Sequence, residues 1–254
     1  MLLAVDIGNT QSSFGVFEQS KLRYHWRGQT KGRGTSDEWA SFFLPLLEHH
    51  RIQRTDFEAI ALCSVVPTVD WAFETFCLDY FHIRPFWVHP GIKLSYRLGV
   101  DTPQEVGADR LANTEYAVCR MELPAVVIDM GTATTFDVVS REKVYGGGII
   151  LPGVTMGIEA LGTQTSKLPL VELSFPKQVI GRNTIDCIRS GILYGYCDLI
   201  DGLIDRVNAE IGRPVSLALT GGVASLFHDR LRHKTQLIPD LTLEGIRLLH
   251  QENT

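Results

Sequence analysis

Short apolar runs separated by polar turns dominate the first half of the chain. Residues 2–8 and 12–18 are apolar segments on either side of a turn, residues 21–26 form a third short segment, and residues 59–67 are almost continuously apolar. Runs of this length, bounded by turn residues, are typical of strands, and a continuous run is typical of a strand covered on both faces. The pattern predicts three successive strands and then an alternation of helices and strands.

Two helices are predicted in the same half. Thr35 and Glu38 have the spacing of a capping box, and apolar residues follow them at helical intervals. Pro45 lies inside this pattern and is expected to kink or shorten the helix. Residues 69–81 form the second predicted helix, and a strand over residues 86–89 follows it.

The clearest helix lies in the second half, where apolar residues keep one face between residues 188 and 211. Gly212 and Pro214 are stop signals. Three glycines inside the helix each weaken it by about 1 kcal/mol relative to alanine. Close approach of another helix would explain why they are there: Gly191, Gly195 and Gly202.

The segment VDIGNTQSSFGV at residues 5–16 has a variant, IDMGTATTFDVV, at residues 128–139. Each is an apolar strand, Asp-x-Gly, small polar residues, a Phe and a second strand. Either segment alone is also explained as a β-hairpin with ordinary turn residues. A repeat at half the chain length instead predicts two similar lobes. The matched residues are Asp6 with Asp129, Gly8 with Gly131 and, after a one-residue slip, Phe14 with Phe136.

A third element of this kind is SLALTGGVASLF at residues 216–227, a strand followed by Thr220, Gly221 and Gly222 and the start of a helix. Glycines let a ligand approach the backbone, and a helix start favours polar or negative groups. A lone Gly-Gly is also an ordinary strand-to-helix turn. The Gly-Gly turn becomes stronger evidence for a ligand site in combination with the two Asp-x-Gly hairpins.

Composition narrows the function classes. The chain has 254 residues, 44% of them hydrophobic and 21% charged, as in a globular protein with a core. Its net charge of −5 and its lack of a Lys/Arg run argue against a nucleic-acid partner. Its five cysteines form no CxxC pair, which favours reduced thiols. We expect no membrane partner and a cytoplasmic location, because no secretory leader precedes Asp6 and no apolar stretch is long enough to span a bilayer.

Together, the two hairpins and the Gly-Gly turn resemble the actin-like ATPase superfamily, which includes actin, ATP-driven chaperones and sugar kinases. Phosphoryl transfer needs positioning and charge neutralisation, and these elements supply both. Asp6 suits Mg²⁺, directly or through water. Asn9, Thr10 and Thr132 would donate hydrogen bonds to phosphate oxygens, although local turn capping also explains such residues.

A separate candidate lies in TPQEVGADRLANTEYAV at residues 102–118, where Asp109 and Arg110 open a helix. A carboxylate at this position is commonly a helix cap or a first-turn charge, and the neighbouring Arg is commonly a surface cation. The alternative is that Asp109 is a general base, which accepts the proton of a hydroxyl group as that group attacks the γ-phosphate.

At this point the chain resembles the type III pantothenate kinases. The resemblance runs in order through nearly the whole sequence, and the ordered set is far more specific than any single piece. Its motifs are DIGNT at 6–10, PQEVGADR at 103–110, DMGTATTFDVV at 129–139, GGGIILPG at 146–153, TSKLP at 165–169 and IGRNTIDCIRSGILYGY at 180–196.

The resemblance implies an α/β fold of two similar ribonuclease H-like lobes, residues 1–120 and 121–254, with the active site in the cleft between them. The first lobe would carry the phosphate loop and the catalytic Asp. The second would carry the second phosphate motif, the Gly-Gly turn and a helix at the dimer interface. The implied activity is ATP-dependent phosphorylation of pantothenate to 4′-phosphopantothenate, the first step of coenzyme A biosynthesis, by a homodimer that uses Mg²⁺ and a monovalent cation, potassium or ammonium.

The resemblance also implies residue roles. Asp109 would be the catalytic base, and Asp129 the potassium ligand. Thr132 would contact ATP, and Thr184 would contact pantothenate, although Thr184 is also placed to cap the following helix. The remaining residues implied at the two binding sites are Gly107, Ala108, Asp109 and Arg110 for pantothenate, and Asp6, Ile7, Gly8, Asn9, Thr10, Gln11, Ser12 and Ser13 for ATP.

The chain departs from the family pattern at Val100, where a substrate-contacting Tyr commonly stands, and Tyr96 is a substitute only if residues 97–100 are an insertion. Glycines 146–148 are equally explained as a flexible turn, so we assign them a structural role first. Two other functions stay open: a kinase of another small hydroxyl substrate, and a non-catalytic regulatory protein on the same scaffold. The intact GADR motif and both hairpins favour turnover, and a chaperone or filament role is disfavoured because the large insertions of those proteins are lacking.

Overall fold

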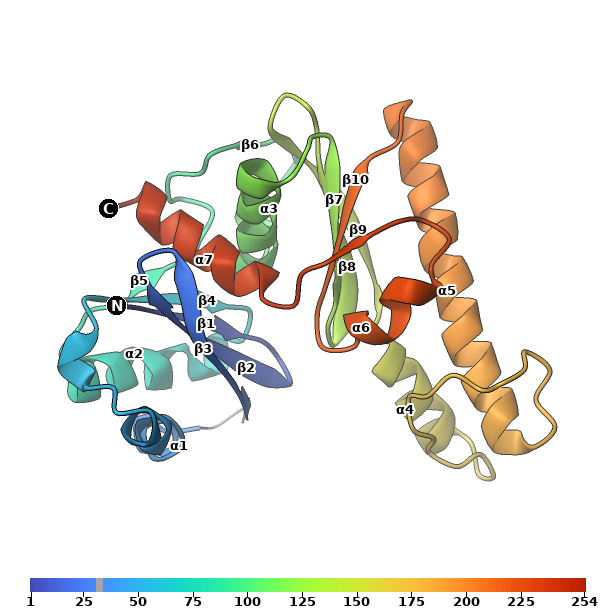
Figure 1. Ribbon diagram of the computed structural model, residues 1–254, viewed down its shortest axis with the longest axis horizontal. Coiled ribbons are helices and arrows are strands. Elements are labelled where there is room, and N and C mark those ends of the chain that lie inside the picture. The colour runs from blue at the N-terminus through green and yellow to red at the C-terminus, as the bar shows by residue number, and fades with distance from the viewer. Residues whose placement is uncertain (31–33) are drawn as a thin grey trace. The chain divides into compact units, whose positions relative to one another are not determined.

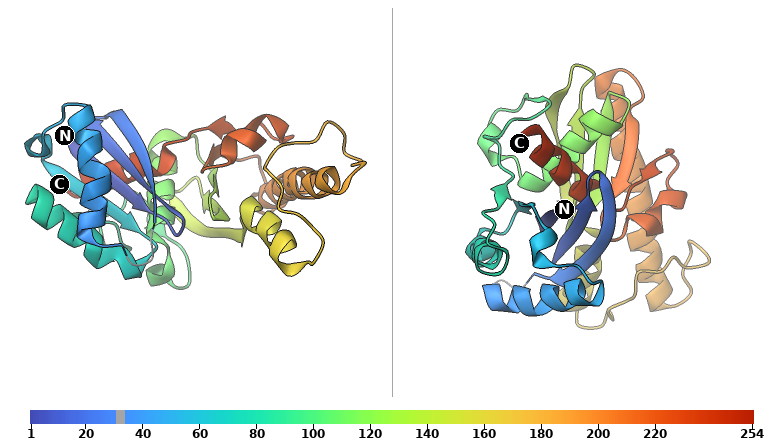
Figure 2. Two further views of the ribbon diagram at one scale, coloured as in Figure 1. Left: turned by 90° about the horizontal axis from the view of Figure 1, so that it is seen from below. Right: turned by 60° about the vertical axis from the view of Figure 1, so that its left-hand side comes forward.

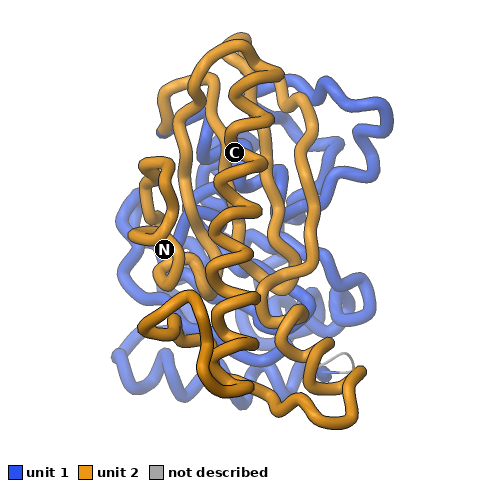
Figure 3. The backbone as a smooth tube through the Cα atoms, turned by 90° about the vertical axis from the view of Figure 1, so that its right-hand side faces the viewer, with its two compact units in different colours: residues 1–120, 240–254 blue, residues 121–239 orange. Residues whose placement is uncertain are grey.

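A computed structural model describes residues 1–30 and 34–254. The chain forms two compact units, which are coloured separately in Figure 3. Unit 1 contains residues 1–120 and 240–254, and unit 2 contains residues 121–239. Within the described residues, no helix is both long enough and apolar enough to cross a membrane. All five cysteines are free thiols.

Unit 1 is built on a five-stranded sheet in the order β3-β2-β1-β4-β5. The first three strands are antiparallel, as the hairpin pattern predicts, whereas β4 is parallel to β1 and β5 is parallel to β4. The strands are β1 (Leu2–Ile7), β2 (Gln11–Glu18), β3 (Lys21–Gln29), β4 (Ala59–Ser64) and β5 (Phe86–Trp87), and a short strand β6 (Arg97–Leu98) follows.

Helices cover both faces of this sheet. Figures 1 and 2 show α1 (Ser36–His49) and α2 (Pro67–Phe81) on one face, and α3 (Ala108–Arg120) and α7 (Leu241–Glu252) on the other. Apolar side chains from the strands and from the first two helices form one core cluster. Its largest fully buried members are aromatic, among them Phe14, Phe43, Phe73 and Phe76.

The predicted start of α1 is confirmed. Thr35 Oγ1 accepts a hydrogen bond from the Glu38 N–H at 3.3 Å, and a Glu38 carboxylate oxygen accepts one from the Thr35 N–H at 2.9 Å. The expectation that Pro45 would shorten the helix is wrong, because α1 continues through it to His49.

The last helix corrects the expected extent of the second lobe, residues 121–254. Residues 240–254 belong to unit 1, because α7 packs directly on α3. Gly245 makes this possible: a Cβ built on it would lie 2.0 Å from the carbonyl oxygen of Ala112. Thr242 on α7 also donates a hydrogen bond to the buried Asn113 side chain on α3, at 2.8 Å.

Unit 2 repeats the strand order of unit 1. Its strands run in the order β9-β8-β7-β10-β11, with β7 and β8 antiparallel, and with β10 parallel to β7 and to β11. Their bounds are β7 (Ala125–Met130), β8 (Ala133–Val139), β9 (Val144–Pro152), β10 (Ser216–Thr220) and β11 (Gln236–Leu237).

Strand register confirms the matched hairpins. Phe14 stands opposite Val5, and Phe136 stands opposite Ile128, so each Phe faces the residue that precedes the Asp of its own hairpin. Three residues join β1 to β2 and only two join β7 to β8. The shorter turn accounts for the one-residue slip between the two sequence segments.

Glycines 146–148 have a structural role, as expected first, although they do not form a turn. They lie within β9, beside a break in the register between Val138 and Val139. Gly147 has φ of 105°, a backbone conformation that side chains disfavour. The glycine run therefore shapes a β-bulge in the strand.

Three helices complete unit 2: α4 (Val154–Gln164), α5 (Thr184–Ile211) and the short α6 (Ala224–Phe227). In Figure 1, α5 (orange) runs along one face of the sheet. Its apolar face joins the core cluster of β7, β8 and β10. Gly212, with φ of 78°, ends it as predicted.

Among the described residues, the glycines inside α5 do not touch another helix. Apart from the backbone of α5 itself, a Cβ built on any of the three would meet no described atom within 4 Å, so the expectation of a close helix is not met within one chain. Positions spaced by 4, 4 and 3 residues share one helix face. The open stripe consists of Gly191, Gly195, the 41%-exposed Leu199 and Gly202.

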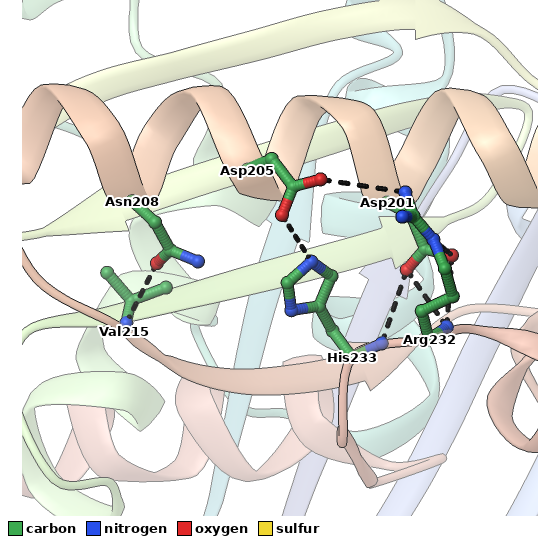
Figure 4. A network of polar contacts seen from close by, with 6 residues as sticks. All are labelled: Asp201, Asp205, Asn208, Val215, Arg232 and His233. Carbon is green, nitrogen blue, oxygen red and sulfur yellow. Dashed lines mark hydrogen bonds and ion pairs between the residues drawn. The ribbon is translucent and has the colours of Figure 1, made fainter.

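Another face of α5 holds the segment that follows α6, as Figure 4 shows. The carboxylate of Asp201, which is buried, accepts hydrogen bonds from the main-chain N–H groups of Arg232 and His233 at 3.0 to 3.3 Å. One helical turn away, Asp205 contacts Nε2 of His233 at 2.8 Å. These contacts fix the connection from α6 to β11 on α5.

Candidate active site

The first predicted phosphate turn joins β1 to β2. The Gly8 N–H donates to the carbonyl oxygen of Gln11 at 3.1 Å and closes the turn. A Cβ on Gly8 would lie 3.0 Å from that same oxygen, so a side chain fits poorly there. Asn9, Thr10 and Gln11 are exposed at the tip, where their side chains are accessible to a ligand.

Two residues of the expected ATP-binding stretch, 6–13, point into the protein instead. Ile7 is fully buried in the core of unit 1. Ser12 is also fully buried, and its hydroxyl group lies 2.8 Å from the hydroxyl group of Thr30. Direct contact with a nucleotide is therefore open to the exposed tip residues rather than to these two side chains.

The predicted base, Asp109, lies in the first turn of α3. Its Oδ1 accepts a hydrogen bond from the Arg110 N–H at 2.8 Å. A Cβ built on Gly107 would lie 2.6 Å from that Oδ1. Glycine is therefore needed at position 107, because it leaves the space that the Asp109 carboxylate occupies.

Burial raises the pKa of Asp109 above the ordinary value for an aspartate, and the Arg110 N–H and the Arg110 charge offset only part of the rise. Desolvation acts in this direction because it disfavours the charged form of a carboxylate. A carboxylate with a raised pKa holds a proton more tightly, which is the property that a general base needs.

The charges of Asp6 and Asp109 both act on Cys63 in unit 1. On the sheet, Asp6 of β1 stands beside Cys63 of β4. The thiol of Cys63 is fully buried, and its pKa is raised well above the usual value, first by burial and then by the negative charges of Asp6 and Asp109. Both carboxylates therefore lie within electrostatic range of one sulfur atom, although they are far apart in the sequence.

Sequence reasoning missed the turn between β4 and α2, which supports the same site. The hydroxyl group of Ser64 donates to Asp70 Oδ1 at 2.5 Å and accepts the Val66 N–H at 3.0 Å. Val65, between them, has Cγ1 only 3.7 Å from a Cβ built on Gly107. The signal was a Ser and an Asp six residues apart around a proline, SVVPTVD, which is too common to interpret alone.

Unit 2 holds the second predicted phosphate turn, which follows Asp129. Gly221, with φ of 99°, lies against it: a Cβ there would be 2.6 Å from Asp129 Oδ1 and 2.6 Å from the Met130 nitrogen. On another side, the Gly153 N–H donates to the Thr132 carbonyl oxygen at 3.1 Å. The Gly-Gly turn of β10 thus lies directly on the Asp-x-Gly turn of β7, as their combination in the sequence suggests.

The Asp129 turn suits a hard cation in its chemistry. Oxygen is the donor that such cations prefer, and the turn contains the carboxylate of Asp129 and the hydroxyl group of Thr132. Glycine at 221 keeps a side chain off the carboxylate. In unit 1, the carboxylate of Asp6 offers the same kind of donor for Mg²⁺.

The structure shows what surrounds two residues considered for the pantothenate site, Thr184 and Tyr96. The cap of α5 is Asn183, whose side-chain oxygen accepts the Asp186 N–H at 2.9 Å, so Thr184 is not the cap and its side chain is exposed. Tyr96 is buried, and its hydroxyl group donates to the Leu111 carbonyl oxygen of α3 at 3.0 Å. Tyr96 therefore fastens its segment to α3, which argues against a role as the substituted aromatic contact.

Comparison with known proteins shows the family of the chain. The family model described as type III pantothenate kinase matches residues 2–206. The chain is 40% identical over 253 residues to a type III pantothenate kinase of Halalkalibacterium halodurans, with 100% of both chains covered.

Two solved structures share the fold at low sequence identity. One is a conserved putative Baf family transcriptional activator from Campylobacter jejuni, with a TM-score of 0.60, 20% identity, and coverage of 99% of this chain and 98% of that one. The other is a putative N-acetylglucosamine kinase from Porphyromonas gingivalis, with a TM-score of 0.53, 12% identity and full coverage of both. The fold is thus the two-lobed α/β fold of actin-like ATPases and sugar kinases. By the extent of the family match and the identity to its curated relatives, the chain belongs to the type III pantothenate kinase family.

Proposed function

We propose that this protein transfers the γ-phosphate of ATP to the hydroxyl group of pantothenate, with Asp109 as the general base. The product is 4′-phosphopantothenate, and the reaction is the first step of coenzyme A biosynthesis. Family membership supports the reaction. The observation that supports the base is the position of Asp109: it lies at the start of α3, beside a glycine that makes room for its carboxylate, and its charge acts on the same buried thiol as the charge of Asp6.

Asp109 accepts the proton of the attacking hydroxyl group. Its raised pKa strengthens it as a base, while the Arg110 N–H keeps one carboxylate oxygen oriented. The reaction also requires that negative charge on the transferred group be neutralised. Mg²⁺ held by Asp6 would supply that neutralisation, and the donors at the exposed tip of the first turn would bind phosphate oxygens.

The nucleotide is proposed to contact the stretch from Asp6 to Ser13, with Thr132 as a further contact. Within that stretch, the side chains of Asn9, Thr10 and Gln11 are the exposed ones. The Gly221–Gly222 turn would accept the nucleoside, since neither residue has a side chain to hinder it. Asp129 is proposed to hold potassium or ammonium.

Pantothenate is proposed to bind along Gly107 to Arg110 and at Thr184. We also propose that the protein is a homodimer, paired through the open stripe of α5. Glycines on an open helix face cost helix stability in a single chain, and they allow a second helix to approach closely. With no membrane span among the described helices, we propose that the enzyme acts in the cytoplasm.

The test uses the purified full chain with ATP and Mg²⁺, with and without pantothenate, and follows ATP consumption and product mass. We expect 4′-phosphopantothenate only when pantothenate is present. ATP consumption with a different hydroxyl compound but not with pantothenate would contradict the proposed acceptor. Protein that binds ATP and phosphorylates nothing would contradict a catalytic role altogether.

A further inference from the structure

Thr30 immediately follows β3 and makes two hydrogen bonds, one to the first phosphate turn and one to the start of β2 directly after that turn. Its main-chain N–H donates to the carbonyl oxygen of Thr10 at 2.9 Å. Its hydroxyl group lies 2.8 Å from the hydroxyl group of Ser12, which is fully buried. Buried polar groups in native proteins almost always have a partner, and the partner of the Ser12 hydroxyl is Thr30.

The end of β3 is itself firmly supported. Gly28, two residues before Thr30, packs against the Phe42 ring, so that a Cβ on Gly28 would lie 3.2 Å from ring carbons. Phe42 lies on α1 and also contacts Phe14, at 5.5 Å between ring centroids. Thr30 thus connects the exposed turn to a well-packed part of unit 1.

The duplicated hairpin of unit 2 has the same arrangement. Gly153 follows β9 as Thr30 follows β3, and its N–H donates to the carbonyl oxygen of Thr132, the residue that corresponds to Thr10. Thr134 corresponds to Ser12 and is likewise buried. Gly153 has no hydroxyl group, and Tyr196 of α5 supplies one instead: its hydroxyl lies 2.6 Å from Thr134 Oγ1 and 3.0 Å from the Pro152 carbonyl oxygen.

We propose that Thr30 in unit 1 and Tyr196 in unit 2 are positioning residues for ATP. Each hydroxyl group fixes the buried Ser or Thr that lies two residues after the phosphate-contacting Thr. Each turn is thereby held in one conformation before the nucleotide arrives, which reduces the cost of ordering on binding. The inference rests on the proposed assignment of the two turns to the phosphates of ATP.

A hairpin turn does not need this support merely to form. The Gly8–Gln11 hydrogen bond already closes the first turn, and the β7–β8 turn has only two residues. That the support recurs in both units with different chemistry, a threonine in one and a tyrosine in the other, favours a role at the two turns themselves.

The first test compares Thr30→Val, which replaces the hydroxyl with a methyl group of similar size, with Thr30→Ser, which keeps the hydroxyl. ATP dissociation constants are measured by calorimetry, and KM values for ATP and pantothenate by product formation. We expect Thr30→Val to weaken ATP binding by roughly five- to tenfold, the size expected for one lost hydrogen bond. The KM for pantothenate should change by less than about twofold, and Thr30→Ser should restore ATP binding.

The second test uses Tyr196→Phe, with Tyr194→Phe as its matched control, because the Tyr194 hydroxyl donates to the Pro176 carbonyl oxygen instead. We expect weaker ATP binding in Tyr196→Phe and unchanged ATP binding in Tyr194→Phe. This pair also keeps the proposal testable if Thr30→Val fails to fold.

Three results would overturn the inference: a thermal midpoint lowered in Thr30→Val with ATP binding unchanged, Thr30→Ser as weak as Thr30→Val, or equal ATP binding in the two tyrosine variants. Because calorimetry reports nucleotide binding without an acceptor, it tests the inference even if pantothenate proves not to be the substrate. Wild-type protein that turns over no pantothenate would contradict the proposed function and leave the binding comparison intact.

Discussion

Gly107 and Asp109 depend on each other, because a side chain at position 107 would occupy the space of the Asp109 carboxylate. Sequence alone predicted the importance of both, but only through resemblance to a family. From the residues themselves, a helix cap or first-turn charge was the favoured interpretation of Asp109. The two roles of Asp109 are distinguished by its burial and by its electrostatic effect on Cys63, which stands beside Asp6 on the sheet. Asp6 and Cys63 lie on strands far from Asp109 in the sequence, so local spacing does not predict this arrangement.

Gly107→Ala is therefore expected to displace the base. A Cβ at 2.6 Å from Asp109 Oδ1 forces the carboxylate to move, and misplacement by about 1 Å can cost on the order of 100-fold in rate. We expect kcat to fall by about this factor. Steady-state kinetics check it, with Gly146→Ala as the control, because a Cβ there would meet its nearest atom at 4.0 Å. Unchanged kcat in Gly107→Ala would contradict the placement.

Asp109 also makes a prediction about stability and pH. Its pKa is raised in the folded protein, so the folded state binds the proton more tightly than the unfolded state does. The free energy of unfolding should then fall as pH rises from the ordinary aspartate pKa, about 4, through the raised value. Asp109→Asn removes this loss, so the variant should be more stable than wild type at pH 7 and should lose that advantage near pH 4. Urea unfolding at several pH values checks this, and a variant that is less stable at pH 7 would contradict it.

At the scale of the element, local signals were reliable and long-range packing was not. The strands of both hairpins, the capping box of α1 and the glycine stop of α5 were predicted because each depends on neighbouring residues. The location of α7 in unit 1 was not predicted, because it depends on Gly245 meeting a carbonyl on α3. A structural role was predicted for glycines 146–148, but the sequence did not distinguish a turn from a bulge, since both use glycine in the same way.

The open stripe of α5 gives the prediction at this scale. Gly195→Leu places a bulky side chain where a second helix is proposed to approach, so a dimer should dissociate to monomer at concentrations where wild type is dimeric. The helix itself should remain folded, because a Cβ at this position would meet no atom of another described element within 4 Å. Light scattering gives the mass and circular dichroism gives the helix content. A Gly195→Leu protein that stays dimeric would show that the stripe is not the interface.

At the scale of the whole molecule, the expected site residues divide between the two units. Asp6 and Asp109 belong to unit 1, whereas Asp129, Thr132 and Thr184 belong to unit 2. The repeat explains this division, because each unit contributes one Asp-x-Gly hairpin with the same strand order. The repeat was visible in the sequence, and the two-lobed architecture followed from it.

The cation proposal concerns the unit 2 hairpin alone. Asp129→Ala removes the carboxylate beside Gly221 and should reduce the stimulation of activity by potassium relative to sodium. Initial rates in the two salts at equal ionic strength check this. An equal potassium response in wild type and variant would remove Asp129 from the cation site.

The most direct test of the account is the turnover of Asp109→Asn. Asparagine keeps the size of the side chain but cannot take the proton, so 4′-phosphopantothenate formation should fall by roughly 100- to 10,000-fold, while ATP still binds as tightly as in wild type. Product formed at the wild-type rate by the folded variant would contradict Asp109 as the base, and with it the central claim about how this protein acts.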